Sequence, residues 1–370
     1  MDSNAHHPNK ITMRLRYNLG RHKLVWLVAI PMLLLAGHLA YWRIAAERLR
    51  SGYDEWRAAR VAEGWDITSG SPSIGGWPRA ATVAVPALTF RHAGPAVPGD
   101  LQASSASITL SVSLFRPTTL MIYLTGATRV RVASQPEVIL DGQDDWLSVP
   151  LRQRGSHSID LHISDLLIQP ASGAWRASAG LLNARAMVAD NVGTGEADAQ
   201  LPAATFTLSA EAIGLPSVVK WPLGANISSL SIEGLMNGPF PPARDITGWA
   251  EAWRDGGGSL AITHLTMGWG PLGLTSSATL ALDEQLQPMG SGNGRIIGYA
   301  ATLDRLAAGG MLTKSAATAA KAVLSLMAGT PDADEPSAVE VPLTLQYRTL
   351  SMRQVPLVRL PELDWPARSW

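Results

Sequence analysis

The chain has 370 residues, with 30 Lys and Arg, 30 Asp and Glu, and no Cys. The balanced charge argues against a nucleic-acid-binding surface, which needs a basic excess, and the lack of Cys excludes disulfides, thiol catalysis and thiolate metal sites. The 34 Gly and 25 Pro are spread along the sequence and keep the elements between them short, which favours a mainly antiparallel β protein.

The first predicted element is a membrane-spanning helix over Leu24–Trp42. This run contains no Asp, Glu, Lys or Arg, and its length is close to the roughly 20 apolar residues that a helix needs to cross a bilayer. Aromatic residues lie near its ends, as is typical of membrane interfaces, and a proline is tolerated inside a membrane helix. The residues that we expect to anchor the helix are Leu24, Trp26, Pro31, Tyr41 and Trp42.

Residues 1–23 are predicted to form a basic tail on the cytoplasmic side, because a short basic arm stays behind while a long domain is exported. Several Arg residues also follow the apolar run, so the orientation rests mainly on the difference in length between the two sides. The alternative is a cleaved signal peptide, for which His38-Leu39-Ala40 is a poor cleavage site. A translation start at Met13 instead of Met1 stays open.

Residues 43–64 keep a helical pattern and predict a stalk helix that leads from the membrane to the rest of the chain. Its apolar residues share one broad stripe, and Gly64 marks its end. The stripe consists of Ile44, Leu49, Tyr53, Trp56, Ala59 and Val61. Residues 65–370 are then expected to form one mainly β domain.

From Thr82 onward, apolar and polar residues alternate at period two, which indicates strands with one buried face. A strand is predicted over each of residues 82–90, 105–114, 136–140 and 146–151, and a hairpin over 119–132 with its turn at Gly126. A similar alternating unit that ends in Pro recurs over residues 158–170, 225–239, 259–271 and 342–356. The recurrence predicts copies of one strand unit in a long sheet.

Two helical segments interrupt the strands. The first is Asp245–Arg254, with Asp245 as its N-cap and a run of glycines after it. The second is Ala301–Met327, broken at Gly309-Gly310, and between the two segments Gly290–Gly294 is interpreted as a flexible turn. The expected fold is therefore mainly β (α+β): one N-terminal transmembrane helix and a stalk helix, then a long curved antiparallel sheet with two covering helical segments.

One polar group has the residue types of a metal site, namely His157, Asp160, His162 and Asp165. In a strand, Asp160 and His162 share a face while the other two point away, so a shared metal would need a bulge. Polar residues at a strand edge are the simpler interpretation. The sequence also lacks a phosphate loop and a nucleophile elbow. We therefore expect no enzymatic activity, and assign no catalytic residue, metal ligand or cofactor.

Five features follow one another in a fixed order. They are the apolar run; Trp56…Gly64-Trp65…Gly75-Gly76-Trp77-Pro78; Trp253…Gly256-Gly257-Gly258-Ser259-Leu260; Trp269-Gly270-Pro271-Leu272; and Val341-Pro342-Leu343…Pro361…Trp365-Pro366. In this order and spacing, from Arg14 to Pro366, the chain resembles the family named domain of unknown function 2125, which consists of membrane-anchored bacterial proteins. Trp77 stands where that family usually has Phe. The family has no established activity, so the resemblance assigns no functional residues.

The segment Trp269–Pro288 is, more distantly, similar to AsmA/TamB-like envelope proteins, whose curved sheets carry an apolar groove associated with lipid movement. Together these observations predict a single-pass inner-membrane protein with its C-terminal domain in the periplasm. We expect a β-sheet groove that binds lipid or another hydrophobic ligand for envelope maintenance, with unidentified ligand-binding residues. The alternative is a structural or interaction protein of the envelope with a closed core. The 13 Trp fit either core packing or an aromatic groove.

Overall fold

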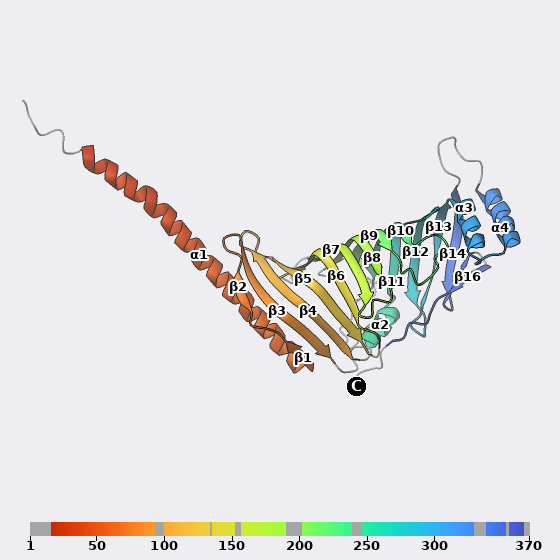
Figure 1. Cartoon of the computed structure of the whole chain (residues 1–370), viewed down its shortest axis with the longest axis horizontal. Coiled ribbons are helices and arrows are strands. Elements are labelled where there is room, and N and C mark those ends of the chain that lie inside the picture. The colour runs from red at the N-terminus through yellow and green to blue at the C-terminus, as the bar shows by residue number, and fades with distance from the viewer. Residues whose placement is uncertain are drawn as a thin grey trace, which may run out of the picture.

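The computed structural model describes residues 16–92, 100–133, 135–151, 157–189, 202–238, 246–328, 338–352 and 355–365. In this part of the chain, sixteen strands form one antiparallel sheet that follows chain order from β1 through β3 to β16, with β2 paired to β3. Figure 1 shows an elongated, open sheet with α1 at one end and α3 and α4 at the other. The predicted mainly β architecture, with a long antiparallel sheet, is confirmed.

The elements have the following bounds. The helices are α1 (Arg16–Ala62), α2 (Ile246–Asp255), α3 (Tyr299–Ala308) and α4 (Lys314–Met327). The first eight strands are β1 (Trp65–Thr68), β2 (Ser73–Gly75), β3 (Ala80–His92), β4 (Leu101–Ser113), β5 (Thr119–Val132), β6 (Val138–Pro150), β7 (His157–Pro170) and β8 (Ala177–Val188). The others are β9 (Pro202–Gly214), β10 (Asn226–Asn237), β11 (Ser259–Trp269), β12 (Leu272–Leu282), β13 (Pro288–Ile297), β14 (Ala338–Gln346), β15 (Thr349–Met352) and β16 (Val355–Arg359).

Helix α1 joins the predicted membrane segment and the predicted stalk into one helix of 47 residues. The stretch Val25–Ala62 contains a window that is long and apolar enough to cross a membrane and that is not covered by the rest of the protein. Figure 1 shows the N-terminal half of α1 projecting beyond the sheet, while its C-terminal half lies along the first strands. The boundary at residue 42 between membrane helix and stalk stays a prediction.

The C-terminal half of α1 is held against the sheet by a closely packed contact. Ala46 has no exposed surface and packs against Ala81 of β3 and Leu114. About two turns further on, Tyr53 is buried in a second cluster with Val83 and Val85. A small side chain at position 46 lets the helix approach the strand closely, so the helix position is fixed by packing as well as by chain connection.

Three hydrogen bonds add to this packing near the start of the docked half. Trp42 donates from Nε1 to the carbonyl oxygen of Gly75 at 3.2 Å, and His38 Nε2 lies 2.8 Å from the carbonyl oxygen of Pro78. Tyr41 donates its hydroxyl hydrogen to the carbonyl oxygen of Leu114 at 3.5 Å. The last residues of the predicted membrane segment therefore contact the β domain.

From β3 to β14 the sheet has one mainly apolar face and one mainly polar face. Residues directly opposite each other on neighbouring strands share a face, so the strand register can be followed from β3 to β14. One row of the apolar face is Val83, Leu110, Ile122, Leu147, Leu161, Ala184, Leu208, Ile232, Leu265, Ser276, Gly294 and Val341. The adjacent polar row is Thr109, Tyr123, Trp146, His162, Asn183, Ser209, Ser231, Thr266, Thr275, Arg295 and Glu340.

Irregular positions interrupt several strands and bend the sheet. Ala87, Gly126, Asp144, Asp165 and Ala212 have φ between 49° and 77°, and the register shifts beside several of them. Such bulges kink a strand and increase its twist. The predicted hairpin at Gly126 is therefore wrong, because this glycine forms a bulge inside the continuous strand β5. For the same reason the two short strands predicted over 136–151 are one strand, β6.

The glycine-rich stretch Gly290–Gly294 lies inside strand β13, so the predicted turn there is also wrong. A Cβ atom at Gly290 would lie 2.0 Å from the carbonyl oxygen of Thr279, so glycine is required by the close approach of β12. The turn between β12 and β13 comes earlier, where Asp283 Oδ1 accepts hydrogen bonds from the backbone N–H groups of Gln285 and Gln287.

The helical segments after β10 agree with the sequence prediction in outline. Helix α2 covers almost the predicted range, whereas its predicted N-cap Asp245 lies outside the described residues. The second segment is divided into α3 and α4 around the predicted break at Gly309-Gly310. Tyr299 of α3 and Leu324 of α4 pack against Val339 and Val341 of β14. These helices therefore cover the apolar face at the C-terminal end of the sheet.

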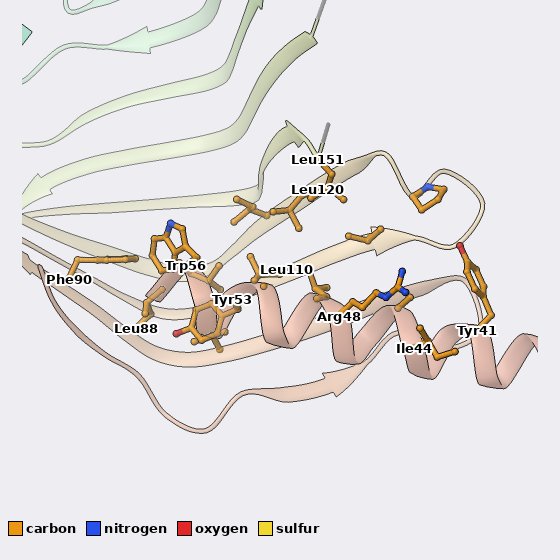
Figure 2. A pocket seen from close by; sticks show the side chains of 18 residues that line it. Tyr41, Ile44, Arg48, Tyr53, Trp56, Leu88, Phe90, Leu110, Leu120 and Leu151 are labelled. Carbon is orange, nitrogen blue, oxygen red and sulfur yellow. The ribbon is translucent and has the colours of Figure 1, made fainter. Parts of the chain in front are cut away.

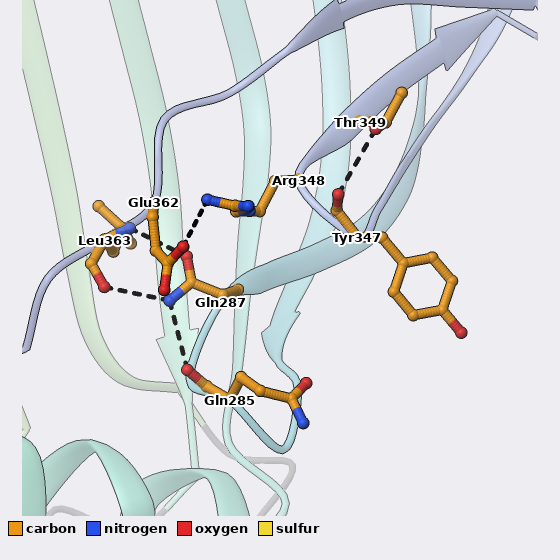
Figure 3. A network of polar contacts seen from close by, with 7 residues as sticks. All are labelled: Gln285, Gln287, Tyr347, Arg348, Thr349, Glu362 and Leu363. Atoms are coloured by element: carbon orange, nitrogen blue, oxygen red, sulfur yellow. Dashed lines mark hydrogen bonds and ion pairs between the residues drawn. The ribbon is translucent and has the colours of Figure 1, made fainter.

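The segment after β16 returns to the turn between β12 and β13 and is tied to it by hydrogen bonds, some of which Figure 3 shows. The buried side chain of Gln287 donates to the carbonyl oxygen of Leu363 and accepts from its N–H, at 3.1 and 2.9 Å. Trp365 donates from Nε1 to the carbonyl oxygen of Leu286, and Arg348 pairs with Glu362. These bonds attach the C-terminal segment to the turn between β12 and β13.

Replacing Ala46 with Leu tests the packing of α1. The added side chain has no space between α1 and Ala81, so we expect the free energy of unfolding to fall by about 1–3 kcal/mol. Chemical unfolding of the full chain in detergent measures this, with the exposed Ala58 changed to Leu as the matched control. Equal stability of the two variants would show that α1 is not closely packed at this point.

Replacing Gln287 with Ala tests the attachment of the C-terminal segment. The substitution leaves the N–H and carbonyl groups of Leu363 without these partners, at a cost of about 1–3 kcal/mol. Hydrogen exchange is expected to become faster at residues 360–365 and to stay unchanged in α1. The control is Gln285→Ala, because residue 285 bonds to Gln287 through its backbone carbonyl oxygen. Equal exchange in both variants would contradict this role.

Candidate functional site

A cavity of about 630 Å³ lies between α1 and strands β3 to β5. Figure 2 shows its lining side chains, with the helix on one side and the strands on the other. The residues that line it are Tyr41, Ile44, Ala45, Arg48, Leu49, Gly52, Tyr53, Trp56, Val85, Leu88, Phe90, Ile108, Leu110, Val112, Pro117, Leu120, Ile122 and Leu151. The lining is almost entirely apolar, which suits a hydrocarbon group better than a polar substrate.

The helical side of the cavity is formed by one stripe of α1. Tyr41, Ala45, Arg48, Gly52 and Trp56 follow one another at intervals of three or four residues, which places them on the same helix face. The apolar stripe predicted on residues 43–64 also contributes to this wall, since Ile44, Leu49, Tyr53 and Trp56 line the cavity.

The strand side contains the irregular position at Ala87. Val85 and Leu88 are three positions apart, and in a regular strand their side chains would point to opposite faces. Ala87 has φ of 51°, which interrupts the regular alternation of the strand while the pairing with β4 keeps its register. Val85 and Leu88 are both buried and both line the cavity, on the side that α1 covers. At this end, Trp56 packs edge-on against Phe90 of β3, with ring centroids 5.9 Å apart.

The other end of the cavity, near Tyr41, carries a positive charge. Arg48 is the only charged residue that lines the cavity, and Figure 2 shows its guanidinium directed toward the Tyr41 end. Glu47, the neighbouring acid, pairs with Arg43 at 2.8 Å. Within the described part of the chain, Arg48 has neither an ion pair nor a hydrogen bond. An unpaired guanidinium beside an apolar cavity is suited to an anionic group attached to a hydrocarbon.

Beyond the cavity, the apolar face continues toward the C-terminal end. In the described part of the chain, α1 packs against β1 to β4, and the other helices pack against β12 and β14. Between these ends, Leu161, Leu208 and Ile232 of the apolar row are only half-buried, and Ile159 on the same face is 38% exposed. The apolar face is therefore open over its middle strands.

The polar group singled out in the sequence does not form one site. Asp160 is paired with Arg185. The Nδ1 atom of His162 lies 2.7 Å from Asn183 Oδ1, and the His162 ring stacks on the ring of Trp146. Asp165 is exposed in its bulge, and the side chain of His157 lies outside the described residues. No group of three or more His, Asp or Glu residues in the described ranges is arranged to hold a metal ion.

The predicted anchor residues have different surroundings in the structure. Trp26 is 66% exposed, and Pro31 is exposed inside α1, whereas Tyr41 and Trp42 bond to the β domain as described above. The side chain of Leu24 lies outside the described residues. A contact of these residues with lipid stays a prediction. Sequence reasoning did not identify Arg48 as a site residue, because only the fold shows that it borders the cavity.

Asp145 on β6 is a titratable group whose pKa is raised by its environment. Burial raises its pKa above 3.8, and so do the charges of Asp141 and Asp144, while His162 opposes them. Its Oδ1 atom is buried and has no hydrogen-bond partner within the described chain. The carboxylate form is therefore less stable in the folded protein than in the unfolded chain.

The variant Asp145→Asn is expected to be more stable than the parent protein at pH 7. A raised folded-state pKa means that the charged form destabilises the folded state above that pKa, and that the penalty disappears as the pH falls toward 3.8. The difference in melting temperature between the two proteins should therefore shrink on acidification. Thermal unfolding at several pH values measures it, with the exposed Asp144 changed to Asn as the control. A pH-independent difference would contradict the assignment.

Comparison with known proteins agrees with the resemblance described in the sequence analysis. The family described as "Uncharacterized protein conserved in bacteria (DUF2125)" matches residues 42–361, which include the docked half of α1 and the sheet through β16. No curated protein and no solved structure matches the chain, so the distant similarity to AsmA/TamB-like proteins stays a prediction. The match spans most of the sequence, and the chain belongs to the DUF2125 family of bacterial proteins.

Proposed function

We propose that this protein is anchored by α1 in the bacterial inner membrane and binds lipid on the apolar face of its sheet, in the periplasm, without catalysing a reaction. The observation that carries the proposal is the open apolar face between α1 and the C-terminal helices. Apolar surface exposed to water is unfavourable by roughly 25 cal/mol per Å², and large exposed apolar patches mark interaction sites. A lipid chain lying on this face would remove that surface from water.

The length and composition of α1 support the membrane location, since its apolar half projects away from the sheet where nothing in the described chain covers it. The basic residues before the apolar run support an orientation with the N-terminus in the cytoplasm. In this orientation the sheet extends from the membrane into the periplasm. Its uncovered apolar face would then lie in the periplasm, between the membranes that contain the envelope lipids.

The second candidate function is a structural or interaction protein of the envelope. The same exposed face favours it, because an apolar partner protein could cover strands β6 to β10 as well as a lipid could. The cavity favours lipid over protein, since it is apolar and lies between α1 and the strands, whereas a protein partner requires a broad accessible surface.

Placing a charge on the apolar face tests whether this face binds lipid, binds a partner protein or binds neither. Leu208 lies on the apolar face of the middle strand β9, and the adjacent Thr207 is exposed on the polar face. We expect Leu208→Glu to reduce the phospholipid that co-purifies with the full chain in detergent, while Thr207→Glu leaves it unchanged. Lipid extraction followed by mass spectrometry measures the molar ratio.

An equal molar ratio of lipid to protein in the parent and in both variants would contradict lipid binding on the sheet. If Leu208→Glu instead removes a co-purifying protein and leaves the lipid ratio unchanged, the envelope interaction function is supported. Circular dichroism of both variants is expected to match that of the parent, because each substitution adds one exposed or half-exposed carboxylate to an otherwise unchanged sheet.

A further inference from the structure

We propose that the cavity beneath α1 is the place where one acyl chain of a membrane phospholipid passes from the bilayer to the sheet, and that Arg48 binds the phosphate of that lipid. This inference rests on the proposed function and gives it a point of access, a ligand class and a specific residue. The cavity and the charge beside it carry the inference independently of the open middle strands.

The position of the cavity along α1 supports this assignment. The same helix that contains the apolar run also forms one wall of the cavity, starting at Tyr41 next to the end of that run. From Tyr41 to Trp56 the helix rises by about 22 Å, at 1.5 Å per residue. The cavity therefore begins at the end of the predicted membrane run and extends along β3 to β5.

Arg48 has the chemistry and the place that a phosphate ligand needs. A planar guanidinium binds phosphate oxygens through two parallel hydrogen bonds, and this one has no partner in the described chain. It lies six residues beyond Trp42, about 9 Å along the helix axis. A phospholipid whose phosphate binds there can keep one chain in the cavity while its headgroup stays in water.

Gly52 keeps space for such a chain on the helical side. It lies one turn after Arg48 on the cavity-lining stripe, and a Cβ atom at this position would have nothing within 4 Å. A glycine inside a helix lowers helix stability relative to Ala. No turn or positive φ at Gly52 requires this residue type, so an open space in the cavity is the structural consequence that remains.

Photo-crosslinking of the full chain in vesicles tests the inference. The vesicles consist of phosphatidylethanolamine and phosphatidylglycerol, with a small share of phosphatidylglycerol that carries a diazirine at the end of one acyl chain. We expect cross-links at cavity residues of β4 and β5, such as Leu110 and Leu120, identified by peptide mass spectrometry. A second probe, a diacylglycerol with the same labelled chain, lacks the phosphate.

Two pairs of variants separate the cavity from the charge. Gly52→Leu fills the cavity and should reduce cross-linking of both probes, while Ala58→Leu, on an exposed position of the same helix, should not. Arg48→Glu should reduce cross-linking of the phospholipid probe about tenfold, as expected for loss of a charge-assisted hydrogen bond, and leave the diacylglycerol probe unchanged. Arg50→Glu, with the same charge change at an exposed position outside the cavity, should affect neither.

The outcomes separate this inference from the proposed function. Cross-links on β8 to β12 without cross-links in the cavity would support lipid binding on the sheet and overturn access beneath α1. Cross-links confined to residues 24–42 would overturn both. Equal loss of the two probes in Arg48→Glu would overturn the phosphate assignment, since a change in cavity shape alone affects both lipids.

Discussion

The structure depends on the fact that successive strands place their apolar side chains on the same side of one sheet. Alternation at period two gives each strand one mainly apolar and one mainly polar row of side chains, and the antiparallel register joins these rows from β3 to β14. A single sheet with an apolar face is unstable in water unless another layer covers it. In the part that the structure describes, the second layer consists of α1, which packs against β1 to β4, and of α2 to α4, which pack against β12 and β14.

The docking of α1 has a second consequence, because it links the predicted membrane segment directly to the covered end of the sheet. Ala46 allows close contact with β3, while a Cβ atom at Gly52 would have nothing within 4 Å. Close packing and an open cavity therefore occur on the same helix within two turns. This arrangement fixes the position of the first strands relative to the predicted membrane segment.

Much of this architecture could be predicted from the sequence because its local patterns are strong. The uncharged apolar run, the alternation of Ile108, Leu110 and Val112, and the break at Gly309-Gly310 each follow from a single physical rule. The bulges could not be predicted in this way. Gly126 has the composition of a turn, and only the pairing with β4 on one side and β6 on the other shows that the strand continues through it.

The site was less predictable than the fold because it joins residues far apart in the chain. The stripe on residues 43–64 indicated that this helix packs on something apolar, but the sequence did not indicate which of its residues would be covered. Arg48 lies on the cavity-lining face of α1 together with Tyr41 and Trp56. Its contact with the cavity depends on how the helix docks on β3. Likewise, the sequence around Gly290 has the composition of a turn. The reason for glycine there is the close approach of β12, which is a tertiary contact that the local sequence does not show.

The central claim is that the middle of the apolar face is occupied by lipid, and the lack of Cys in the chain makes a direct measurement practical. A spin label would be attached at Ile232→Cys, on the apolar face of β10, and in a second sample at Glu233→Cys, on the polar face. In phospholipid vesicles, we predict that oxygen relaxes the first label more than a water-soluble nickel complex does, and that the second label shows the reverse. Equal access of the nickel complex to both labels would contradict the account.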